Sequence, residues 1–392
     1  MTTRNRGNEV VNWIELAEET SSEVLEPSSS EVDRTGIIPV THFEHLASRG
    51  LYGVAMATDD PVATLPAIGE ILVSGCLSTA FVWAQHHGTL LRLATSRNES
   101  LKTRYLDNMR TGTVKAGVSG SGYAAPERPL IRASRVSGGY SITGRAPFVT
   151  GWNLIDVLGI TAYDEGSDET VTFLAPAEER PGLSALPKHL VAANASNTVE
   201  LEFDKYCVDD EDVVNVGPGN RHRRSTLSML DRVIIRINGS LALGVSRGCL
   251  QNLDALGASS ERLRPRLAVI RDQLNFALQD RGGDVYAARA QASHFAVEVA
   301  AYYATVAGSG AVKKASTAER LCREALFALV CTSTTEIRET VQASIASIAH
   351  AEGASETTNS AQLKPSSCVG DHDHESPSGV QAESVSGLSG DE

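Results

Sequence analysis

The spacing of apolar side chains changes twice along the chain, first near residue 115. Before that point the spacing is helical: between Asn8 and Val24, apolar residues recur at intervals of three and four. The acidic, serine-rich stretch over residues 27–36 predicts a link after this helix. Further helices are predicted over His42–Arg49, Ile68–Ala94 and Leu101–Met109. We therefore expect an N-terminal helical domain over residues 1–115.

The pattern after residue 114 is that of short strands separated by turns. The runs VKAGV, LIRASRV, YSITG, VLGITAY, TVTFLA and NTVELEF are rich in residues that favour strands. Glycines at 138 and 139 and the sequence DEG at 164–166 stand where hairpin turns are needed. Several short strands at this spacing predict a small β-barrel or sandwich over residues 116–216.

Helical spacing returns near Ser225 and predicts a C-terminal four-helix bundle over residues 217–350. Its long helices are expected over Leu241–Leu256, Pro265–Leu278, Asp284–Val306 and Ala318–Ile348. Pro265 suits the first residue of a helix, where its missing N–H needs no partner. Residues 351–392 contain almost no large apolar side chains and are predicted to be a disordered acidic tail. The predicted fold class is α+β, mostly α.

Charge and cysteine content exclude several classes of protein. The 392 residues contain 35 Lys and Arg against 48 Asp and Glu, a formal net charge of −13. Residues 351–392 carry eight acidic residues against Lys364 alone, so −7 of this charge lies in the tail and −6 in the rest. Binding of nucleic acid is not expected, because it requires clustered cations.

The cellular location is expected to be the cytoplasm. The six cysteines are scattered with no CxxC pair, which predicts reduced thiols rather than disulfides. The first residues become charged before any apolar stretch could form a signal peptide, and no run of eighteen apolar residues is present. We therefore expect no membrane span, and the spacing of ligand-type residues predicts no metal site.

Four stretches carry recognisable motifs in a fixed order along the chain. They are LKTRYLDNMRTG followed by KAGVSGSG, then GGYSITGRAPFVTGWNLIDVLGI, then NTVELEFDKYCVDDEDVV, and finally GSLALGVSRGCLQNL with AGSGAVKKASTAERLCREALF. Together they resemble the acyl-CoA dehydrogenase superfamily of flavoproteins over roughly residues 35–345. The second stretch resembles the pattern G-x-K-x-[WF]-[IV]-T-N-G, which lies against the flavin in that family.

The resemblance implies a bound FAD and assigns residues of the β-domain to it. Phe148 falls where the family places an aromatic side chain beside the isoalloxazine ring, and Thr150 where a hydroxyl reaches its N5 edge. Val118 and Ser119 fall in the loop that contacts the pyrimidine end. These residue types suit a flat ring with apolar faces and one polar edge.

The bundle residues implied by the resemblance point to a homodimer or homotetramer. Gly308 and Gly310 match a glycine-rich turn that approaches a cofactor bound mainly by another subunit. Arg323 matches the arginine of the family's R-D-A pattern, which reads R-E-A here. The alternative for Arg323 is an ion pair on the helix surface with Glu319 or Glu324.

The sequence departs from the family at the catalytic base, which removes the α-proton of an acyl thioester. Most members have a glutamate in a Y-E-G-T turn, where this chain has Thr332. A threonine hydroxyl is not a competent base. The alternative position, near residues 234–235, also lacks a carboxylate. Nearby carboxylates are Glu336, Glu339 and Asp231, for which solvated surface positions are the simpler interpretation.

A second departure concerns the FAD pyrophosphate. The family usually has R-x-x-F-G followed by a glutamine, and this chain has LDALGASSERLRPRL. Arg262, Arg264 or Arg266 could substitute, because guanidinium groups suit pyrophosphate oxygens.

Two adjacent histidines, His86 and His87, lie on the helix whose counterpart lines the bottom of the family's acyl pocket. Trp83 and His87 stand one helical turn apart, and the bulky indole is expected to shorten the pocket. Paired histidines suit flavin monooxygenases of the same fold, because imidazole can exchange a proton near neutral pH. Surface or capping histidines are the alternative.

Three functions follow from these patterns. The first is an FAD-dependent oxidoreductase acting on the CH–CH group of an acyl thioester, carried by CoA or a carrier protein. The second is a flavin-dependent monooxygenase of the same fold. The third is a non-catalytic, flavin-free binding or scaffold protein.

Overall fold

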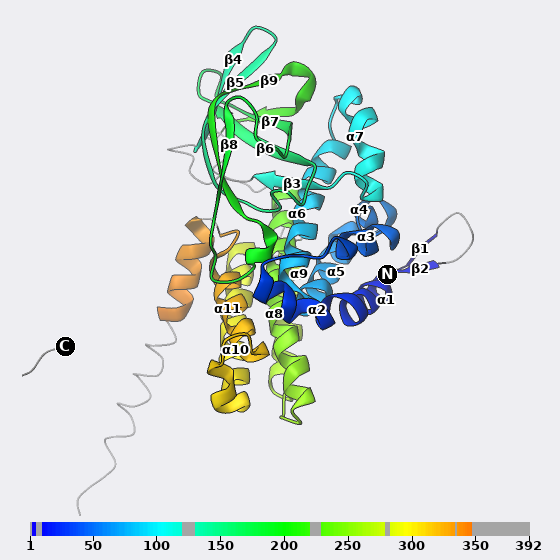
Figure 1. Cartoon of the computed structure of the whole chain (residues 1–392), viewed down its shortest axis with the longest axis vertical. Coiled ribbons are helices and arrows are strands. Elements are labelled where there is room, and N and C mark those ends of the chain that lie inside the picture. The colour runs from blue at the N-terminus through cyan, green and yellow to red at the C-terminus, as the bar shows by residue number, and fades with distance from the viewer. Residues whose placement is uncertain are drawn as a thin grey trace, which may run out of the picture. The chain divides into compact units, whose positions relative to one another are not determined.

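The computed structural model describes residues 2–4, 10–119, 130–219, 229–278, 283–333 and 335–346 (Figure 1). The chain divides into two compact units, Met1–Ala346 and Ser347–Glu392, and every described residue belongs to the first. The predicted tail over 351–392 lies outside the described residues.

The N-terminal region is mostly helical. Strands β1 (Thr2–Arg4) and β2 (Val10–Asn12) pair with each other before the first helix. That helix begins at Trp13, later than predicted, with the Asn12 side chain accepting from the backbone of Glu15. The helices are α1 (Trp13–Thr20), the π-turn Ser21–Leu25, α2 (Glu26–Thr35), α3 (Val40–Ser48), α4 (Val54–Ala57), α5 (Pro61–Gly75), α6 (Leu77–Ala94) and α7 (Glu99–Thr111).

Two predictions for this region were wrong. Residues 27–36 were expected to form a link, but α2 covers almost all of them. The hydroxyls of Ser28 and Ser29 donate to carbonyls of the preceding turn, which satisfies them inside a helix. The helix predicted over Ile68–Ala94 is two helices, because the chain is extended at Cys76 between α5 and α6.

The central region is one mixed sheet of eight strands in the order β10-β7-β6-β4-β5-β9-β8, with β3 pairing parallel to β6. Each predicted run overlaps a strand, and the Gly138 turn joins β4 to β5 at a φ of 80°. Strands β8 and β10 were missed, since both are short and end in proline. The bounds are β3 (Ala116–Ser119), β4 (Ile131–Val136), β5 (Gly139–Val149), β6 (Val157–Asp164), β7 (Glu169–Pro176), β8 (Leu183–Pro187), β9 (Val199–Asp209) and β10 (Val213–Pro218).

Four long helices follow: α8 (Met229–Ala255), α9 (Leu263–Phe276), α10 (Val285–Ala307) and α11 (Thr317–Val330). Helix α8 packs against α5, α9, α10 and α11. Its approach to α5 requires Gly244, where a Cβ atom would lie 2.4 Å from Cβ of Val73. Pro265 lies in the first turn of α9 rather than at its first residue. The helix predicted over Ala318–Ile348 ends at Val330, and residues 335–346 form a separate helical stretch after a turn.

Two of the described helical segments are long and apolar enough to cross a membrane by length and composition alone. In the most apolar 18-residue stretch of each segment, 78% is buried for Asp231–Ala255 and 33% for Val285–Val312. The core helix of a soluble protein passes the same test, and packing within the bundle explains the first segment.

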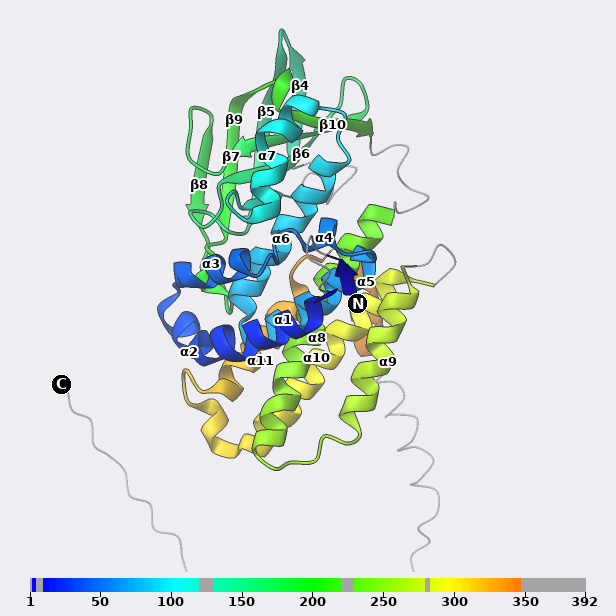
Figure 2. The same cartoon turned by 90° about the vertical axis from the view of Figure 1, so that its right-hand side faces the viewer.

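Helix α6 joins the helical part of the molecule to the sheet (Figures 1 and 2). The Thr89 hydroxyl donates to the Gly117 carbonyl of β3 over 2.7 Å. On β6, a Cβ atom at Gly159 would lie 2.5 Å from the same hydroxyl, so only glycine permits this contact. The close approach places the side chains of α6 next to β3 and β6.

Candidate functional site

The end of β5 presents one exposed aromatic side chain and one buried hydroxyl. Phe148 is 62% exposed although it lies within a strand. Thr150, one residue beyond β5, is buried, and its hydroxyl lies 3.2 Å from that of Thr198. Gly151 follows at a φ of 96°, which sets the sharp turn after the strand.

Strand β3 ends beside this turn with a second buried hydroxyl. A Cβ atom at Gly117 would lie 3.2 Å from the Thr150 carbonyl, so the strand and the turn are in close contact. Ser119 is buried, and its hydroxyl has no hydrogen-bond partner within the described part of the chain. Val118 is half-buried and points toward Gly88 of α6. The rest of the predicted loop lies outside the described residues.

The exposed ring of Phe148 and the hydroxyls of Thr150 and Ser119 have the chemistry that a flavin needs. An aromatic side chain can cover one face of the ring system, and hydroxyls can donate to its polar edge. A buried hydroxyl without a protein partner costs about 1–3 kcal/mol unless something else bonds to it. These residues therefore suit the ring end of FAD.

The two histidines of α6 are fully buried, so their interpretation as surface or capping residues was wrong. The Trp83 indole N–H donates to the Leu51 carbonyl over 3.1 Å, which holds the ring in place. The His87 ring meets it edge-on, with 4.5 Å between centroids. Nδ1 of His86 accepts from the backbone N–H of Ala116 over 3.0 Å, so the proton of the neutral ring is on Nε2.

Both imidazoles are neutral near pH 7 because of their burial. Burial, with a smaller contribution from Lys115, lowers the pKa of His86 to about 3, and the Met109 carbonyl opposes this only in part. Burial also lowers the pKa of His87 well below its usual range, and neighbouring His86 adds to the effect. In this state they act as hydrogen-bonding groups rather than cations.

Replacing His86 with asparagine is expected to make stability less sensitive to acid. An imidazole that is neutral when folded but protonated when unfolded disfavours folding progressively as the pH falls below its unfolded pKa, toward its folded pKa. With a folded pKa of about 3 for His86, the wild-type protein loses about 2 kcal/mol through this group from about pH 7 to 5. Denaturant unfolding at both pH values measures the free energy of unfolding. Between pH 7 and pH 5 this free energy should fall by about 2 kcal/mol less in the variant than in the wild type. Equal losses would mean that the folded ring is protonated.

Tyr52 was missed by the sequence analysis because it lies on a loop far from α6 in the sequence. Its ring meets His86 edge-on at 4.9 Å between centroids. The hydroxyl is buried without a hydrogen-bond partner among the described residues, and burial raises its pKa strongly. No pattern of residues near position 52 indicates this contact.

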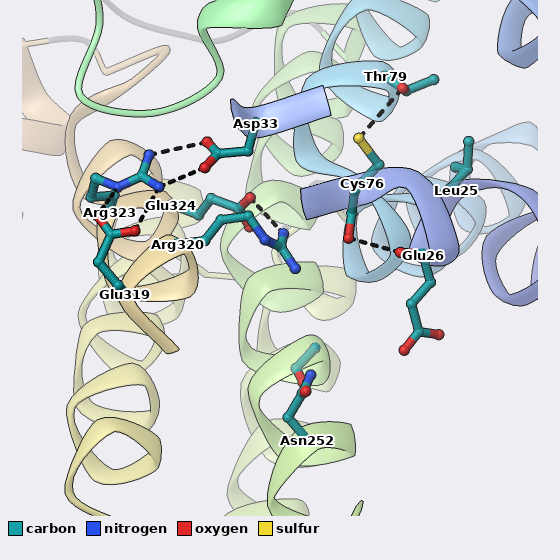
Figure 3. Close-up of polar contacts among 12 residues, drawn as sticks. Leu25, Glu26, Asp33, Cys76, Thr79, Asn252, Glu319, Arg320, Arg323 and Glu324 are labelled. Atoms are coloured by element: carbon teal, nitrogen blue, oxygen red, sulfur yellow. Dashed lines mark hydrogen bonds and ion pairs between the residues drawn. The ribbon is translucent and has the colours of Figure 1, made fainter. Parts of the chain in front are cut away.

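The glycine-rich turn of the bundle is exposed, whereas Arg323 is held in ion pairs. Gly308 and Gly310 lie in the 3₁₀ turn Gly308–Val312 after α10. Figure 3 shows Arg323 between Asp33 of α2 and Glu319 of its own helix, with shortest distances of 2.6 and 2.5 Å. The alternative of an ion pair with Glu319 or Glu324 is confirmed through Glu319.

Glu324 belongs to a neighbouring buried ion pair, 2.8 Å from Arg320 (Figure 3). Of the arginines considered for the pyrophosphate, Arg264 and Arg266 pair with Asp254 and Glu298 of the same chain. Arg262 is exposed next to α9.

Thr332 lies in an exposed turn after α11 at a φ of 51°, a conformation unusual for a β-branched residue. Fully buried Arg289 of α10 donates to the carbonyls of Ala328 and Cys331, at 3.2 and 3.5 Å, and so holds the end of α11. Glu336 and Glu339 are exposed on the helical stretch that follows.

Metal binding and disulfides find no support in the described residues. No group of three or more His, Cys, Asp or Glu side chains there could hold a metal ion. The described cysteines are all free: Cys76, Cys207, Cys249, Cys322 and Cys331.

Comparison with known proteins finds relatives in sequence and in fold. No protein-family model matches the chain. It is 24% identical over 366 residues to cyclohex-1-ene-1-carbonyl-CoA dehydrogenase of Geobacter metallireducens, covering 84% of this chain and 95% of the relative. It is 26% identical over 222 residues to L-evernosamine nitrososynthase of a Micromonospora species, covering 52% of each.

Solved structures show the same fold at lower identity. A glutaryl-CoA dehydrogenase with glutaryl-CoA superposes with a TM-score of 0.71 and 16% identity, over 84% of this chain and 93% of the other. PigA with FAD and proline superposes with a TM-score of 0.70 and 17% identity, over 85% of this chain and 96% of the other. Dibenzothiophene monooxygenase from Paenibacillus superposes with a TM-score of 0.68 and 16% identity, over 84% of this chain and 95% of the other. The predicted resemblance and fold class are confirmed.

Proposed function

We propose that this chain, whose fold is that of the acyl-CoA dehydrogenase superfamily, is an FAD-dependent oxidoreductase acting on the CH–CH group of an acyl thioester. One observation carries the proposal: exposed Phe148, buried Thr150 and the buried hydroxyl of Ser119, which has no partner among the described residues, lie at adjoining ends of β5 and β3. The sequence similarity to an acyl-CoA dehydrogenase supports the substrate class.

Each residue of this group has a separate role. When bound, FAD supplies the acceptor for two electrons removed from the substrate. Phe148 would cover one face of the flavin ring, and the hydroxyls of Thr150 and Ser119 would donate to its polar edge. Proton removal is the step for which the chain is least equipped, because Thr332 replaces a carboxylate at the base position.

The absorbance spectrum of the purified protein, before and after incubation with FAD and removal of the excess, tests cofactor binding. Bands near about 370 and 450 nm are expected of bound flavin. Anaerobic mixing with acyl-CoA or acyl-carrier-protein thioesters should then bleach them. If no thioester reduces the flavin, the proposed dehydrogenase function is refuted. A protein that takes up no flavin would be the binding or scaffold protein.

Phe148→Ala is expected to weaken FAD binding about tenfold, because the stacked aromatic face is lost. Its stability should hardly change, since the ring is 62% exposed. The matched control is Leu186→Ala, which removes a side chain 51% exposed on β8 of the same sheet. Flavin fluorescence titration measures both, and equal affinities in the two variants would remove Phe148 from the site.

A second candidate, a flavin-dependent monooxygenase, is favoured by the buried neutral pair His86 and His87 together with threonine at the base position. The shared fold with a monooxygenase is compatible with it. Reduced protein mixed with oxygen distinguishes the two candidates. Oxygen consumption coupled to a hydroxylated product supports the monooxygenase, and reoxidation with release of hydrogen peroxide alone argues against it.

The protein is further proposed to be a cytoplasmic homodimer or homotetramer. Large apolar side chains are exposed on the last three long helices, at Val269, Phe276, Tyr302, Val306, Leu326 and Val330. Such a concentration of exposed apolar surface suits packing against a second copy. Light scattering of the purified protein measures the assembly, and a monomer would contradict it.

A further inference from the structure

Three buried hydroxyl groups form a hydrogen-bonded row behind the end of β5. The Thr150 hydroxyl lies 3.2 Å from that of Thr198, which in turn lies 2.9 Å from that of Ser196. Thr150, Thr198 and Ser196 are 5%, 4% and 0% exposed. This hydroxyl row therefore leads from the fully buried Ser196 to the strand end at which Phe148 is exposed.

The backbone holds the hydroxyl row in place. The Gly151 N–H donates to the Ser196 carbonyl over 2.8 Å, and the Trp152 N–H donates to the Asn197 carbonyl over 3.1 Å. Asn197 adopts a φ of 46°, a left-handed conformation that makes the bend between Ser196 and Thr198. The turn after β5 and the turn before β9 are thereby fixed to each other, which keeps the three hydroxyls within hydrogen-bonding distance.

The number of hydroxyl protons determines the direction of the hydroxyl row. Three hydroxyls carry three protons, whereas the two bonds within the row use only two of them. Among the described residues, these hydroxyl groups have no other hydrogen bond. A third proton left on Ser196 or Thr198 would be buried without an acceptor, which is unfavourable. If Ser196 donates to Thr198 and Thr198 donates to Thr150, the remaining proton is on Thr150, at the strand end where a ligand can accept it.

We propose that Ser196 and Thr198 are positioning residues, which orient the Thr150 hydroxyl so that it donates to the polar edge of the FAD ring. A hydroxyl that accepts a hydrogen bond becomes a better donor, because bonds in a row polarise one another. Neither residue touches the cofactor in this arrangement, and both act through Thr150. This inference rests on the proposed function and deepens it, since it names the residues that make Thr150 a donor rather than an acceptor.

Thr198→Val, which removes the hydroxyl with little change in shape, is expected to weaken FAD binding about three- to tenfold, the usual effect of losing one hydrogen bond. Thr198→Ser keeps a hydroxyl and should retain the wild-type affinity. The matched control is Thr172→Val on β7, whose buried hydroxyl lies 3.0 Å from that of Thr161 on β6 of the same sheet. It should leave FAD affinity unchanged. Flavin fluorescence titration of the purified full-length protein measures all three variants.

A double-mutant cycle separates positioning from a general loss of structure. If Thr198 acts through Thr150, Thr198→Val should not weaken FAD binding further once Thr150→Val is present. The absorbance band of bound flavin near about 450 nm should move to the same wavelength in both single variants and keep its wild-type position in Thr172→Val. Losses of affinity that multiply in the double variant would overturn the proposal. So would a Thr198→Val variant that binds FAD as tightly as the wild type.

The two proposals fail in different ways, because FAD affinity and absorbance are measured without turnover. A flavoprotein that no thioester reduces, but whose FAD affinity falls in Thr198→Val and not in Thr172→Val, refutes the dehydrogenase and supports the hydroxyl row. A flavoprotein that oxidises a thioester but binds FAD equally with and without the Thr198 hydroxyl does the reverse. A wild-type protein that takes up no FAD, which is measured first, would refute both.

Discussion

Thr332→Glu is expected to increase the anaerobic rate of flavin reduction by an acyl thioester about 10²–10⁴-fold, the usual contribution of a positioned general base. The substitution puts a carboxylate where the resemblance places the catalytic base. The turn can accept it, because Thr332 is exposed and already adopts a φ of 51°, where an unbranched side chain is less strained than threonine. Stopped-flow absorbance of the flavin band measures the rate.

The matched control is Thr332→Gln, which has nearly the same shape but cannot accept the proton. Buried Arg289, which holds the end of α11 through the Cys331 carbonyl, adds a positive charge that favours the ionised glutamate. An equal gain from both variants would mean that shape rather than basicity matters. No gain from either would show that this turn does not face the substrate, and would favour the monooxygenase.

Glu70→Ala is expected to lower the free energy of unfolding by about 3–5 kcal/mol, because it leaves buried positive charge uncompensated. Glu70 of α5 is 3% exposed and accepts from Arg271 of α9 at 2.8 and 2.5 Å. Arg236 of α8 is buried close by, bonded to Asn275 and Ser240. Burial lowers the pKa of Arg236 to about 10, and the Glu70 charge opposes this.

Glu298→Ala is the control for this prediction. It removes one partner of the Arg266–Glu298 pair, whose side chains are 52% and 39% exposed. Exposed pairs contribute about 0–1 kcal/mol, so this variant should be nearly as stable as the wild type. Urea unfolding followed by circular dichroism measures both. Similar losses in the two variants would show that Glu70 does not neutralise Arg236 and Arg271.

Local signals in the sequence account for most of the predicted elements. Asn98 and Gly112 border α7 as an N-cap that accepts from Leu101 and a left-handed C-cap at a φ of 76°. The strand runs were found because alternation and turn glycines act over a few residues. Helix α2 was missed for the same reason, since serine and proline usually indicate a link and here lie within a helix.

Contacts between distant segments could not be read in this way. The burial of His86 and His87 depends on β3 and on the loop around Leu51, which reach α6 only in the folded chain. The partner of Arg323 on α2, Asp33, is equally remote in the sequence. Even the assignment of Glu319 rather than Glu324 to Arg323 depended on which face of α11 meets α2.

By itself, the sequence determined the order of helical and β-rich regions and the family resemblance, and it predicted Phe148, Thr150 and Ser119 as a flavin-binding set. Patterns of three to ten residues are sufficient for these, because hydrogen bonding within helices and hairpins is local. Only the tertiary structure decided that the α6 histidines are neutral and that Tyr52 joins them. Burial and pKa depend on what packs around a side chain, and those neighbours come from segments that lie far apart in the sequence.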